Sequence, residues 1–200
     1  MIAGLVLAGG ESRRMGSDKA LIPIQGKPAF LYFAELLTPF CETVYVSCRT
    51  AQQLTLEDDP TIVGLFDRPA HAGRGPMSGI LSYLSHSSDN QSSENHSSDN
   101  QSINHPDGLL VLGCDYRNMT EEVLSTLVAV GQSQNRICCY QNHLTQFIEP
   151  LVAYYPTETL KNLPEFAKKN TSLRAFVQSN NPCILPTDIK TLNALRSFDH

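Results

Sequence analysis

The chain has 200 residues, of which 41% are hydrophobic and 18% charged, enough apolar material for the core of one domain. Its 15 Lys and Arg against 20 Asp and Glu give a net charge of -5, which argues against nucleic-acid binding by the surface as a whole. The apolar runs are shorter than the roughly 18 residues that cross a bilayer, and no basic residue precedes the first run, so we expect neither a membrane span nor a secretory signal.

Strand-like apolar runs alternate with helical segments along the first two thirds of the chain. The predicted strands are Ile2–Leu7, Thr43–Cys48, Thr61–Gly64, Gly108–Gly113 and Arg136–Tyr140. The predicted helices are Ala29–Leu37, Met77–Leu84 and Thr120–Val130, the last with Thr120 as its N-cap. This alternation predicts an α/β protein with three α/β/α layers around a mostly parallel, Rossmann-like sheet, because continuous apolar runs are typical of strands buried on both faces.

The last third of the chain gives a weaker pattern. We expect extended chain over His143–Tyr155 with a break at Pro150, and a short strand over Cys183–Leu185. The predicted helices are Glu158–Lys169, Leu173–Gln178 and Asp188–Phe198, with Asp188 near the N-cap of the last.

Residues 86–105 differ in composition from the rest of the chain. The sequence HSSDNQSSEN is followed by the near-repeat HSSDNQSINH, with almost no apolar residue in either. Such a segment cannot bury enough surface to offset its ordering entropy, so we expect a disordered insert at 86–105 within a single domain spanning 1–200. Three histidines in it, His86, His96 and His105, offer an alternative interpretation as a metal-binding group.

The six cysteines show neither a Cys-x-x-Cys spacing nor a paired Cys/His pattern. Most of them lie inside apolar stretches, as in VYVSC and VLGC. We therefore expect reduced thiols that pack in the core of a cytoplasmic protein.

The strongest local feature is the segment LAGGESRRMGSDKA, residues 7–20, which follows the first predicted strand. Gly9 and Gly10 permit positive φ angles and a close approach of backbone amides to an anion. Arg13, Arg14 and Lys19 add three positive charges. Because ligands bind at the carboxyl ends of strands in an open α/β sheet, this segment predicts a phosphate-binding loop.

Two common phosphate motifs do not fit this loop. The P-loop motif needs a Gly-Lys followed by Ser or Thr, and the spacing from Gly10 to Gly16 is too long for it. The dinucleotide motif GxGxxG is absent because Gly9 and Gly10 are adjacent. For the two glycines alone, a simple tight turn is an equally good interpretation.

The segment LAGGESRRMGSDKAL resembles the signature LAGGxSxRMGxDK of the molybdenum cofactor guanylyltransferases, in the sugar-nucleotidyltransferase-like superfamily. Further segments agree in order and approximate spacing with this family. They are Asp67, GPMSGI from Gly75, VLGCD ending at Asp115, EPLVAYY from Glu149 and TSLRAF from Thr171. Apart from the insert, the resemblance covers nearly the whole chain.

The resemblance implies a nucleotidyltransferase fold and the transfer of GMP from GTP to molybdopterin carrying molybdenum, with release of pyrophosphate. It implies Mg²⁺ as cofactor, held by Asp115 at the end of a buried strand. Lys19, Arg14 and Asp115 are the expected catalytic residues. The expected nucleotide-binding residues are Leu7, Ala8, Gly9, Gly10, Ser12, Lys19, Arg49, Asp67, Gly75 and Asp115. Beyond these substrates, the resemblance implies transient contact with molybdoenzymes or cofactor chaperones. We expect neither a nucleic acid nor a membrane as a binding partner.

The sequence departs from the family pattern at three places. Arg117 stands where the family often has proline, Ser47-Cys48-Arg49 replaces a motif that ends in asparagine, and only Pro186-Thr187-Asp188 remains of a C-terminal NTPxD motif. These departures leave two alternatives open. One is a cytidylyltransferase of the same fold that acts on molybdopterin or on a small phosphorylated alcohol. The other is a nucleotide-binding adaptor without transfer activity, although an adaptor would not need the carboxylate of Asp115.

Overall fold

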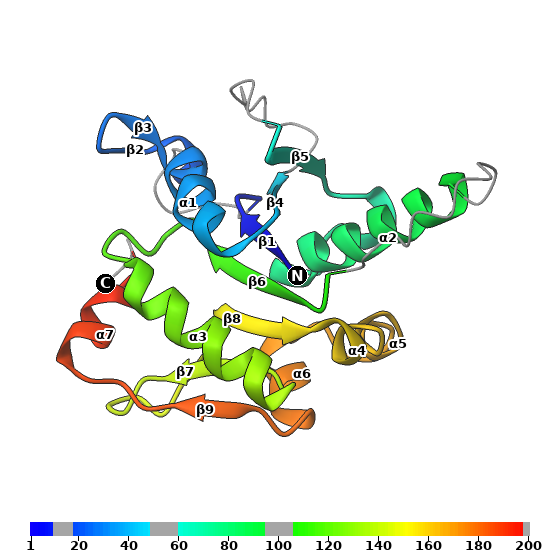
Figure 1. Cartoon of the computed structure of the whole chain (residues 1–200). Helices are drawn as coiled ribbons and strands as arrows, with labels where there is room; N and C mark the ends of the chain where they lie inside the picture. Colours follow the sequence, from blue (N-terminus) through cyan, green and yellow to red (C-terminus); the bar gives the residue numbers. More distant parts are fainter. Residues whose placement is uncertain (10–17, 49–59, 95–105, 198–200) are drawn as a thin grey trace.

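The computed structural model describes residues 1–9, 18–48, 60–94 and 106–197 of the chain. Its centre is a sheet in the strand order β5-β4-β1-β6-β8-β7-β9 (Figure 1). The strands are β1 (Ile2–Leu7), β4 (Thr43–Cys48), β5 (Ile62–Phe66), β6 (Gly108–Gly113), β7 (Cys138–Gln141), β8 (Ile148–Pro156) and β9 (Cys183–Leu185). Strand β8 runs antiparallel to both its neighbours, and the other pairings are parallel.

Helices cover both faces of this sheet. The helices on one face are α1 (Ala29–Leu37), α3 (Glu121–Gln134) and α7 (Ile189–Ala194), and those on the other are α2 (Pro76–Glu94), α4 (Thr157–Leu160), α5 (Leu163–Ala167) and α6 (Leu173–Ser179). Shorter elements complete the connections. They are the 3₁₀ turns η1 (Lys19–Leu21), η2 (Thr38–Phe40) and η3 (Pro69–His71), and a small hairpin of β2 (Pro23–Ile24) and β3 (Lys27–Pro28). The described helices include none that is long and apolar enough to cross a membrane.

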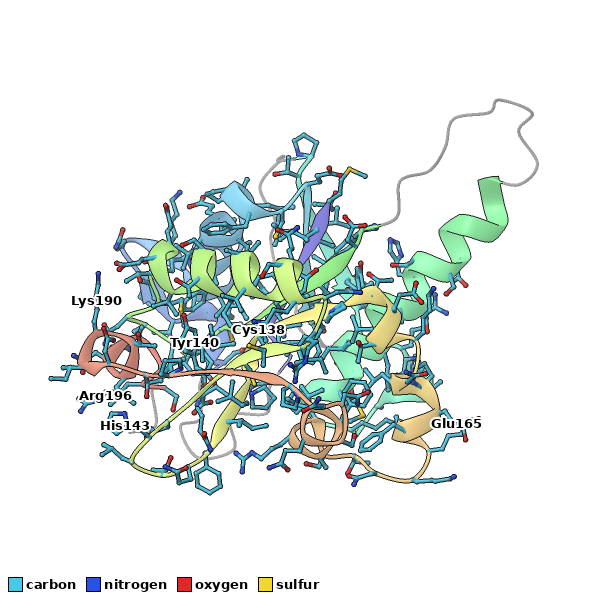
Figure 2. All side chains as sticks on the ribbon, turned by 60° about the horizontal axis from the view of Figure 1, so that its bottom comes forward. Cys138, Tyr140, His143, Glu165, Lys190 and Arg196 are labelled. Atoms are coloured by element: carbon cyan, nitrogen blue, oxygen red, sulfur yellow. The ribbon has the colours of Figure 1, made fainter. Side chains whose placement is uncertain are left out.

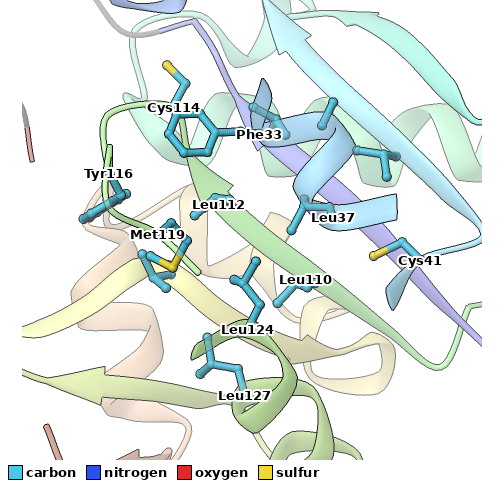
Figure 3. Packing of buried hydrophobic residues seen from close by; sticks show 14 of the residues in the cluster. Phe33, Leu37, Cys41, Leu110, Leu112, Cys114, Tyr116, Met119, Leu124 and Leu127 are labelled. Atoms are coloured by element: carbon cyan, nitrogen blue, oxygen red, sulfur yellow. The ribbon is translucent and has the colours of Figure 1, made fainter. Parts of the chain in front are cut away.

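Strand β6 shows why the sheet has helices on both sides. All six of its residues are buried, and their side chains alternate between two cores. Leu110 and Leu112 pack with α1 and α3, as Figure 3 shows, whereas Leu109 and Val111 face α2 and α6. A strand buried on both faces needs a continuous apolar run, and this is what Gly108–Gly113 supplies.

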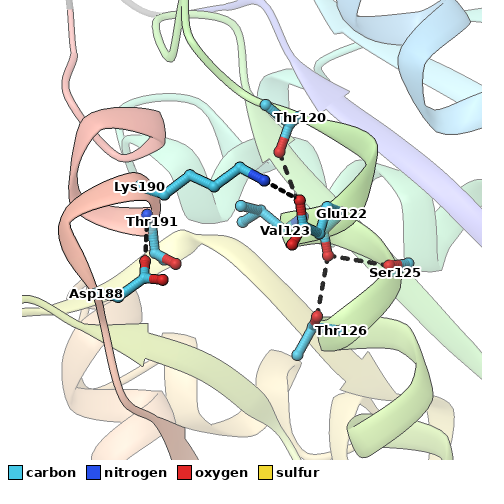
Figure 4. Close-up of polar contacts among 8 residues, drawn as sticks. All are labelled: Thr120, Glu122, Val123, Ser125, Thr126, Asp188, Lys190 and Thr191. Atoms are coloured by element: carbon cyan, nitrogen blue, oxygen red, sulfur yellow. Dashed lines mark hydrogen bonds and ion pairs between the residues drawn. The ribbon is translucent and has the colours of Figure 1, made fainter.

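Side-chain caps define where two helices on the same face begin (Figure 4). The hydroxyl of Thr120 accepts a hydrogen bond from the amide of Val123 at the start of α3. Asp188 caps α7 in the same way through the amide of Thr191, at 2.7 Å. This backbone hydrogen bond lowers the pKa of the Asp188 carboxyl. An ion pair between Lys190 and Glu122 then joins α7 to the first turn of α3.

Most predicted elements agree with the structure within a few residues, and three expectations were wrong. The chain is not broken at Pro150, which lies inside β8, where the pairing with β7 shifts register between Cys139 and Gln141. Proline has no amide hydrogen, so it is tolerated at such an irregularity. The helix expected over 158–169 is two short helices, α4 and α5. Pro164 lies in the first turn of α5, a position where proline is tolerated because its missing amide hydrogen is not needed there.

The third difference concerns the predicted insert. Helix α2 continues to Glu94, so residues 86–94 are helical instead of disordered, and 95–105 lie outside the described residues. Two contacts hold the first part of this extension. The His86 ring packs edge-on against Tyr45 with 5.6 Å between ring centroids, and Asp89 forms an ion pair with Arg68. These tertiary contacts therefore stabilise a helical stretch whose composition alone predicts disorder.

Substitution of Gly131 by alanine tests how tightly the sheet packs on α3. A Cβ at this position would lie 2.2 Å from Cδ1 of Tyr154. At the other end of the same side chain, a Cβ on Gly108 would lie 2.3 Å from the hydroxyl oxygen. We expect Gly131→Ala to lower the free energy of unfolding by about 1–3 kcal/mol, measured by urea denaturation. Ser133→Ala, exposed on the same helix, is the control and should change it by less than about 0.5 kcal/mol. Equal stability of Gly131→Ala and the wild type would contradict the packing.

Candidate functional site

The carboxyl ends of four parallel strands meet at one edge of the sheet, and backbone hydrogen bonds fix their relative positions. Past the end of β1, the amide of Ala8 donates to the carbonyl of Ser47 at 2.9 Å. The amide of Asp67, after β5, donates to the carbonyl of Cys48 at 2.9 Å, and that of Cys114, after β6, donates to the carbonyl of Leu7 at 3.4 Å. The polar residues that follow these strands are thereby collected at one edge.

Lys19 and Asp115 face each other at this edge. The Lys19 Nζ and the Asp115 Oδ2 are 4.0 Å apart, and both side chains are mostly buried, with 17% and 25% of their surface exposed. Asp18 determines where Lys19 lies, because its carboxylate accepts a hydrogen bond from the amide of Ala20 and so caps η1. The arrangement places one cation and one anion beside the end of β1, where the glycine loop begins.

Asp67 is held by a serine that the sequence did not single out. The hydroxyl of Ser47 donates to the Asp67 Oδ1 at 2.6 Å, and Ser47 is buried. Gly79 of α2 explains how the helix comes so close. A Cβ on Gly79 would lie 2.5 Å from the Ser47 Oγ and 2.6 Å from the Leu7 Cδ2. A glycine is therefore required here, and the only sequence signal for it was its place in the GPMSGI segment.

The connection from β5 to α2 is bonded back onto the helix. The amide of Arg68 donates to the hydroxyl of Ser82 at 3.0 Å, and the hydroxyl of Ser78 donates to the carbonyl of His71 at 2.6 Å. Gly75 has a φ of +58°, a conformation that suits glycine, and its carbonyl accepts from the amide of Ser78 where α2 begins. Gly75 thus sets the start of the helix whose next turn touches Leu7 and Ser47.

A second group of side chains lies beside Asp115, at the start of β8. The hydroxyl of Tyr116 donates to the Glu149 Oε2 at 3.2 Å. Burial raises the pKa of the Glu149 carboxyl, and the Tyr116 hydrogen bond and the nearby positive charge of Arg174 oppose that shift. The Arg174 guanidinium lies 4.2 Å from the centre of the Phe147 ring. Sequence reasoning placed Glu149 in a family motif without giving it a role.

The loop between β7 and β8 lies at one end of the molecule. His143 follows β7 and contacts the hydroxyl of Thr187 with its Nδ1 at 3.0 Å, just before α7. Figure 2 shows His143 at the same end as Lys190 and Arg196, with Glu165 of α5 at the opposite end. His143 therefore contacts the chain that leads into α7.

The thiol beside Asp115 is unsuited to nucleophilic chemistry. Burial, reinforced by the charge of Asp115, raises the pKa of Cys114 to about 12. Burial with the charge of Asp67 raises the pKa of Cys48 to about 11. Thiols with such pKa values are protonated at neutral pH, whereas the thiolate is the reactive form. Neither thiol is therefore activated as a nucleophile at this edge.

The structure describes some of the expected site residues and not others. Those it brings to the shared edge or to the α2 entry beside it are Leu7, Ala8, Gly9, Lys19, Asp67, Gly75 and Asp115. Gly10, Ser12, Arg14 and Arg49, together with Arg13, lie outside the described residues. Arg117, two residues after Asp115, is exposed.

The donor set at the edge fits a cation that arrives with a polyphosphate. Among the described residues no group of three or more His, Cys, Asp or Glu side chains could hold a metal by itself. Asp115 offers a single, partly exposed carboxylate at the end of β6. Magnesium in nucleotide sites is bound by one or two carboxylates with phosphate oxygens and water, so a site of this kind needs no protein cage.

Comparison with known proteins gives consistent results. The model of the MobA-like NTP transferase domain matches residues 4–183. A molybdenum cofactor biosynthesis bifunctional protein of Synechocystis is 38% identical over 154 residues, which are 76% of this chain and 38% of that protein. A probable molybdenum cofactor guanylyltransferase of Methanocaldococcus jannaschii is 25% identical over 94% of this chain and 88% of its own length. This chain therefore spans well under half of the bifunctional relative.

A solved structure has the same fold. Molybdopterin-guanine dinucleotide biosynthesis protein A from Archaeoglobus fulgidus superposes with a TM-score of 0.71 at 22% identity, over 98% of this chain and 91% of that one. The predicted α/β fold with a mostly parallel sheet is thus confirmed.

The buried thiols give a test of the site's packing. All six cysteines are free, and five of them are buried. We expect a thiol reagent such as DTNB to modify no more than one cysteine, Cys183, in the native protein at pH 8, and all six after denaturation. Mass spectrometry of the modified peptides identifies the site. Rapid labelling of Cys114 would contradict the structure.

Proposed function

Because the chain belongs to the MobA-like NTP transferase domain family, we propose that it transfers GMP from GTP to the terminal phosphate of molybdopterin that carries molybdenum. A phosphate oxygen of the acceptor forms a bond to the α-phosphorus of GTP, the bond from that phosphorus to the bridging oxygen of the β-phosphate breaks, and pyrophosphate leaves. The products are the guanine dinucleotide form of the cofactor and pyrophosphate. The names of the relatives in Synechocystis and Methanocaldococcus support this acceptor.

The observation that carries the proposal is the pairing of Lys19 with Asp115 across the ends of β1 and β6. Their charged atoms are 4.0 Å apart, and both side chains retain some exposure. An incoming triphosphate provides anionic oxygens for Lys19 and leaves Asp115 to share a cation with them. Phosphoryl chemistry of this kind needs positioning and charge stabilisation more than a nucleophile from the protein, and the protonated Cys114 thiol agrees with that.

In this proposal the nucleotide lies over the ends of β1, β4 and β5. The backbone of Leu7, Ala8 and Gly9 contacts the base and the phosphates together with Gly10 and Ser12. Asp67, held by Ser47, accepts hydrogen bonds from the ribose hydroxyls or the guanine edge. The other proposed contacts come from Arg14 to the β- and γ-phosphates, Arg49 to the guanosine and Gly75 at the entry to α2.

Asp115 is the residue that would hold Mg²⁺ when it enters with GTP. The ion supplies charge neutralisation on the phosphate oxygens. Lys19 binds other oxygens of the same phosphates. Its backbone position is set by Asp18, which caps η1. Because GTP is the substrate, we propose the cytoplasm as the site of the reaction. Delivery of the product implies transient contact with molybdoenzymes or cofactor chaperones.

Asp115→Asn tests the role of the carboxylate. We expect kcat for pyrophosphate release to fall about a hundredfold or more, because the substitution keeps the size and removes the charge that binds the cation. Asp107→Asn is a matched control at the opposite end of β6, where the carboxylate is exposed and pairs with the N-terminus. Its kcat should equal that of the wild type.

The same assay discriminates between the alternatives when it is run with GTP and CTP. Product formation from CTP but not GTP would replace the proposal by cytidylyl transfer. Binding of GTP with no transfer to molybdopterin would support the adaptor. Equal activity of Asp115→Asn and the wild type would contradict the assignment of the metal carboxylate.

Ser47→Ala tests the contribution of Asp67. The substitution removes the 2.6 Å hydrogen bond by which Ser47 orients the Asp67 carboxylate. We expect the KM for GTP to rise about fivefold with a small change in kcat, as the loss of one hydrogen bond predicts. Ser125→Ala, whose hydroxyl donates to a carbonyl within α3, is the control. An unchanged KM in Ser47→Ala would exclude a role for Asp67 that depends on this bond.

A further inference from the structure

Tyr116 and Asp115 approach the same point at the end of β6. A Cβ placed on Gly113 would lie 3.1 Å from the Asp115 Oδ1 and 3.1 Å from the Tyr116 Cε2. The carboxylate and the ring therefore both lie close over the backbone of Gly113, where a larger residue would displace one of them. Because the Tyr116 ring is buried in the core shown in Figure 3, it is the fixed part of this pair, and the partly exposed Asp115 is the part that reaches the solvent.

The hydroxyl of Tyr116 has one described hydrogen-bond partner, the Glu149 Oε2 at 3.2 Å. The Tyr116 hydroxyl is the donor of this bond, because the oxygen of an ionised carboxylate can only accept. This bond joins the loop after β6 to the first residues of β8. The hydroxyl of Tyr155 fixes that segment from the other side, since it donates to the carbonyl of Pro150 at 2.7 Å.

Arg174 provides a positive charge near Glu149. Phe147 lies two residues before Glu149, just ahead of the start of β8. The Arg174 guanidinium stacks on Phe147 at 4.2 Å from its centre, and its charge stabilises the ionised form of Glu149. The buried Nε of Arg174 has no hydrogen-bond partner among the residues that the structure describes, and the described contact of this side chain is its stacking on Phe147.

We propose that Glu149 is a positioning residue, which fixes the Asp115 carboxylate for cation binding by holding the Tyr116 hydroxyl. The inference rests on the proposed function in one respect, that Asp115 binds the divalent cation that accompanies the nucleotide. Glu149 itself acts as a hydrogen-bond acceptor, so an uncharged acceptor of the same shape should serve in its place. Glu149 thereby connects β8 and α6 to the strand that carries the metal carboxylate.

Four variants separate this role from others. Glu149→Gln keeps an oxygen that accepts from Tyr116, Glu149→Ala removes it, and Tyr116→Phe removes the donor. The control is Tyr140→Phe, which deletes a buried hydroxyl that donates to the carbonyl of Val123 at 2.9 Å, on the α3 side of the sheet. The first measurement is Mn²⁺ binding in the presence of GTP, followed by electron paramagnetic resonance. The second is the dependence of kcat on Mg²⁺ concentration.

We expect Glu149→Ala and Tyr116→Phe to weaken Mn²⁺ binding about fivefold each, as the loss of one hydrogen bond predicts, and to raise the half-saturating Mg²⁺ concentration by a similar factor. The double variant should be no weaker than either single variant, because both remove the same bond. Glu149→Gln should stay within about twofold of the wild type, as should Tyr140→Phe.

Two results would overturn the inference. If Glu149→Gln loses as much Mn²⁺ affinity as Glu149→Ala, the charge of Glu149 matters and it is a direct ligand or an electrostatic partner instead. If Tyr116→Phe and Tyr140→Phe lower the melting temperature alike and leave Mn²⁺ binding unchanged, the Tyr116 bond serves stability alone. Tyr116→Phe retains the buried ring, so it keeps the test valid even if Glu149→Ala does not fold.

The experiment separates failure of the inference from failure of the proposed function. Wild-type protein that binds Mn²⁺ with GTP but makes no product would refute guanylyl transfer and leave the positioning role standing. Wild-type protein that makes product, with Mn²⁺ affinity unaffected by Glu149→Ala and Tyr116→Phe, would refute the positioning role and leave the transfer reaction standing.

Discussion

The shared edge of the four parallel strands is the constraint on which the rest of the site depends. Leu7 pairs with Ser47 on one side and with Gly113 on the other, so the end of β1 lies between the ends of β4 and β6. Burial of β6 on both faces prevents its register from shifting, since a one-residue slip would exchange the two cores. Lys19, Asp67 and Asp115 therefore occupy fixed positions although they are far apart in sequence.

Small residues allow the charged groups to come together at this edge. Gly79 lets α2 lie against Ser47 and Leu7, and Gly113 leaves space for Asp115 beside the ring of Tyr116. A methyl group on Gly79 would meet its neighbours at 2.5 Å, closer than packed atoms tolerate, and one on Gly113 would meet Asp115 and Tyr116 at 3.1 Å, so that these side chains would have to shift slightly. Backbone packing thus determines how closely Asp67 and Asp115 approach the end of β1. The hydrogen bond from Ser47 orients Asp67, and in our proposal the bond between Tyr116 and Glu149 does the same for Asp115.

Family membership and the chemistry of the site both point to nucleotidyl transfer, and each supports a different part of that conclusion. The family match spans residues 4–183 and defines the class of reaction. The packing agrees with a reaction whose nucleophile comes from the substrate and not from a cysteine of the protein. Its thiols are buried with raised pKa values, while the lysine and the carboxylate suited to phosphate chemistry remain partly exposed.

Local sequence patterns were sufficient for the elements and for the residues with recognisable motifs. Continuous apolar runs identified the buried strands, and Thr120 and Asp188 were correctly predicted as caps. Spacing and family resemblance also predicted Lys19 and Asp115 as site residues. The structure places them 4.0 Å apart, and their roles stay a prediction. The tertiary structure alone decided three things: the passage of β8 through Pro150, the helical extension over 86–94, and the partners Ser47 and Glu149. Each depends on contacts between residues that are distant in the chain. A local sequence pattern reports only which residues are neighbours in sequence, and not which ones the fold brings together in space.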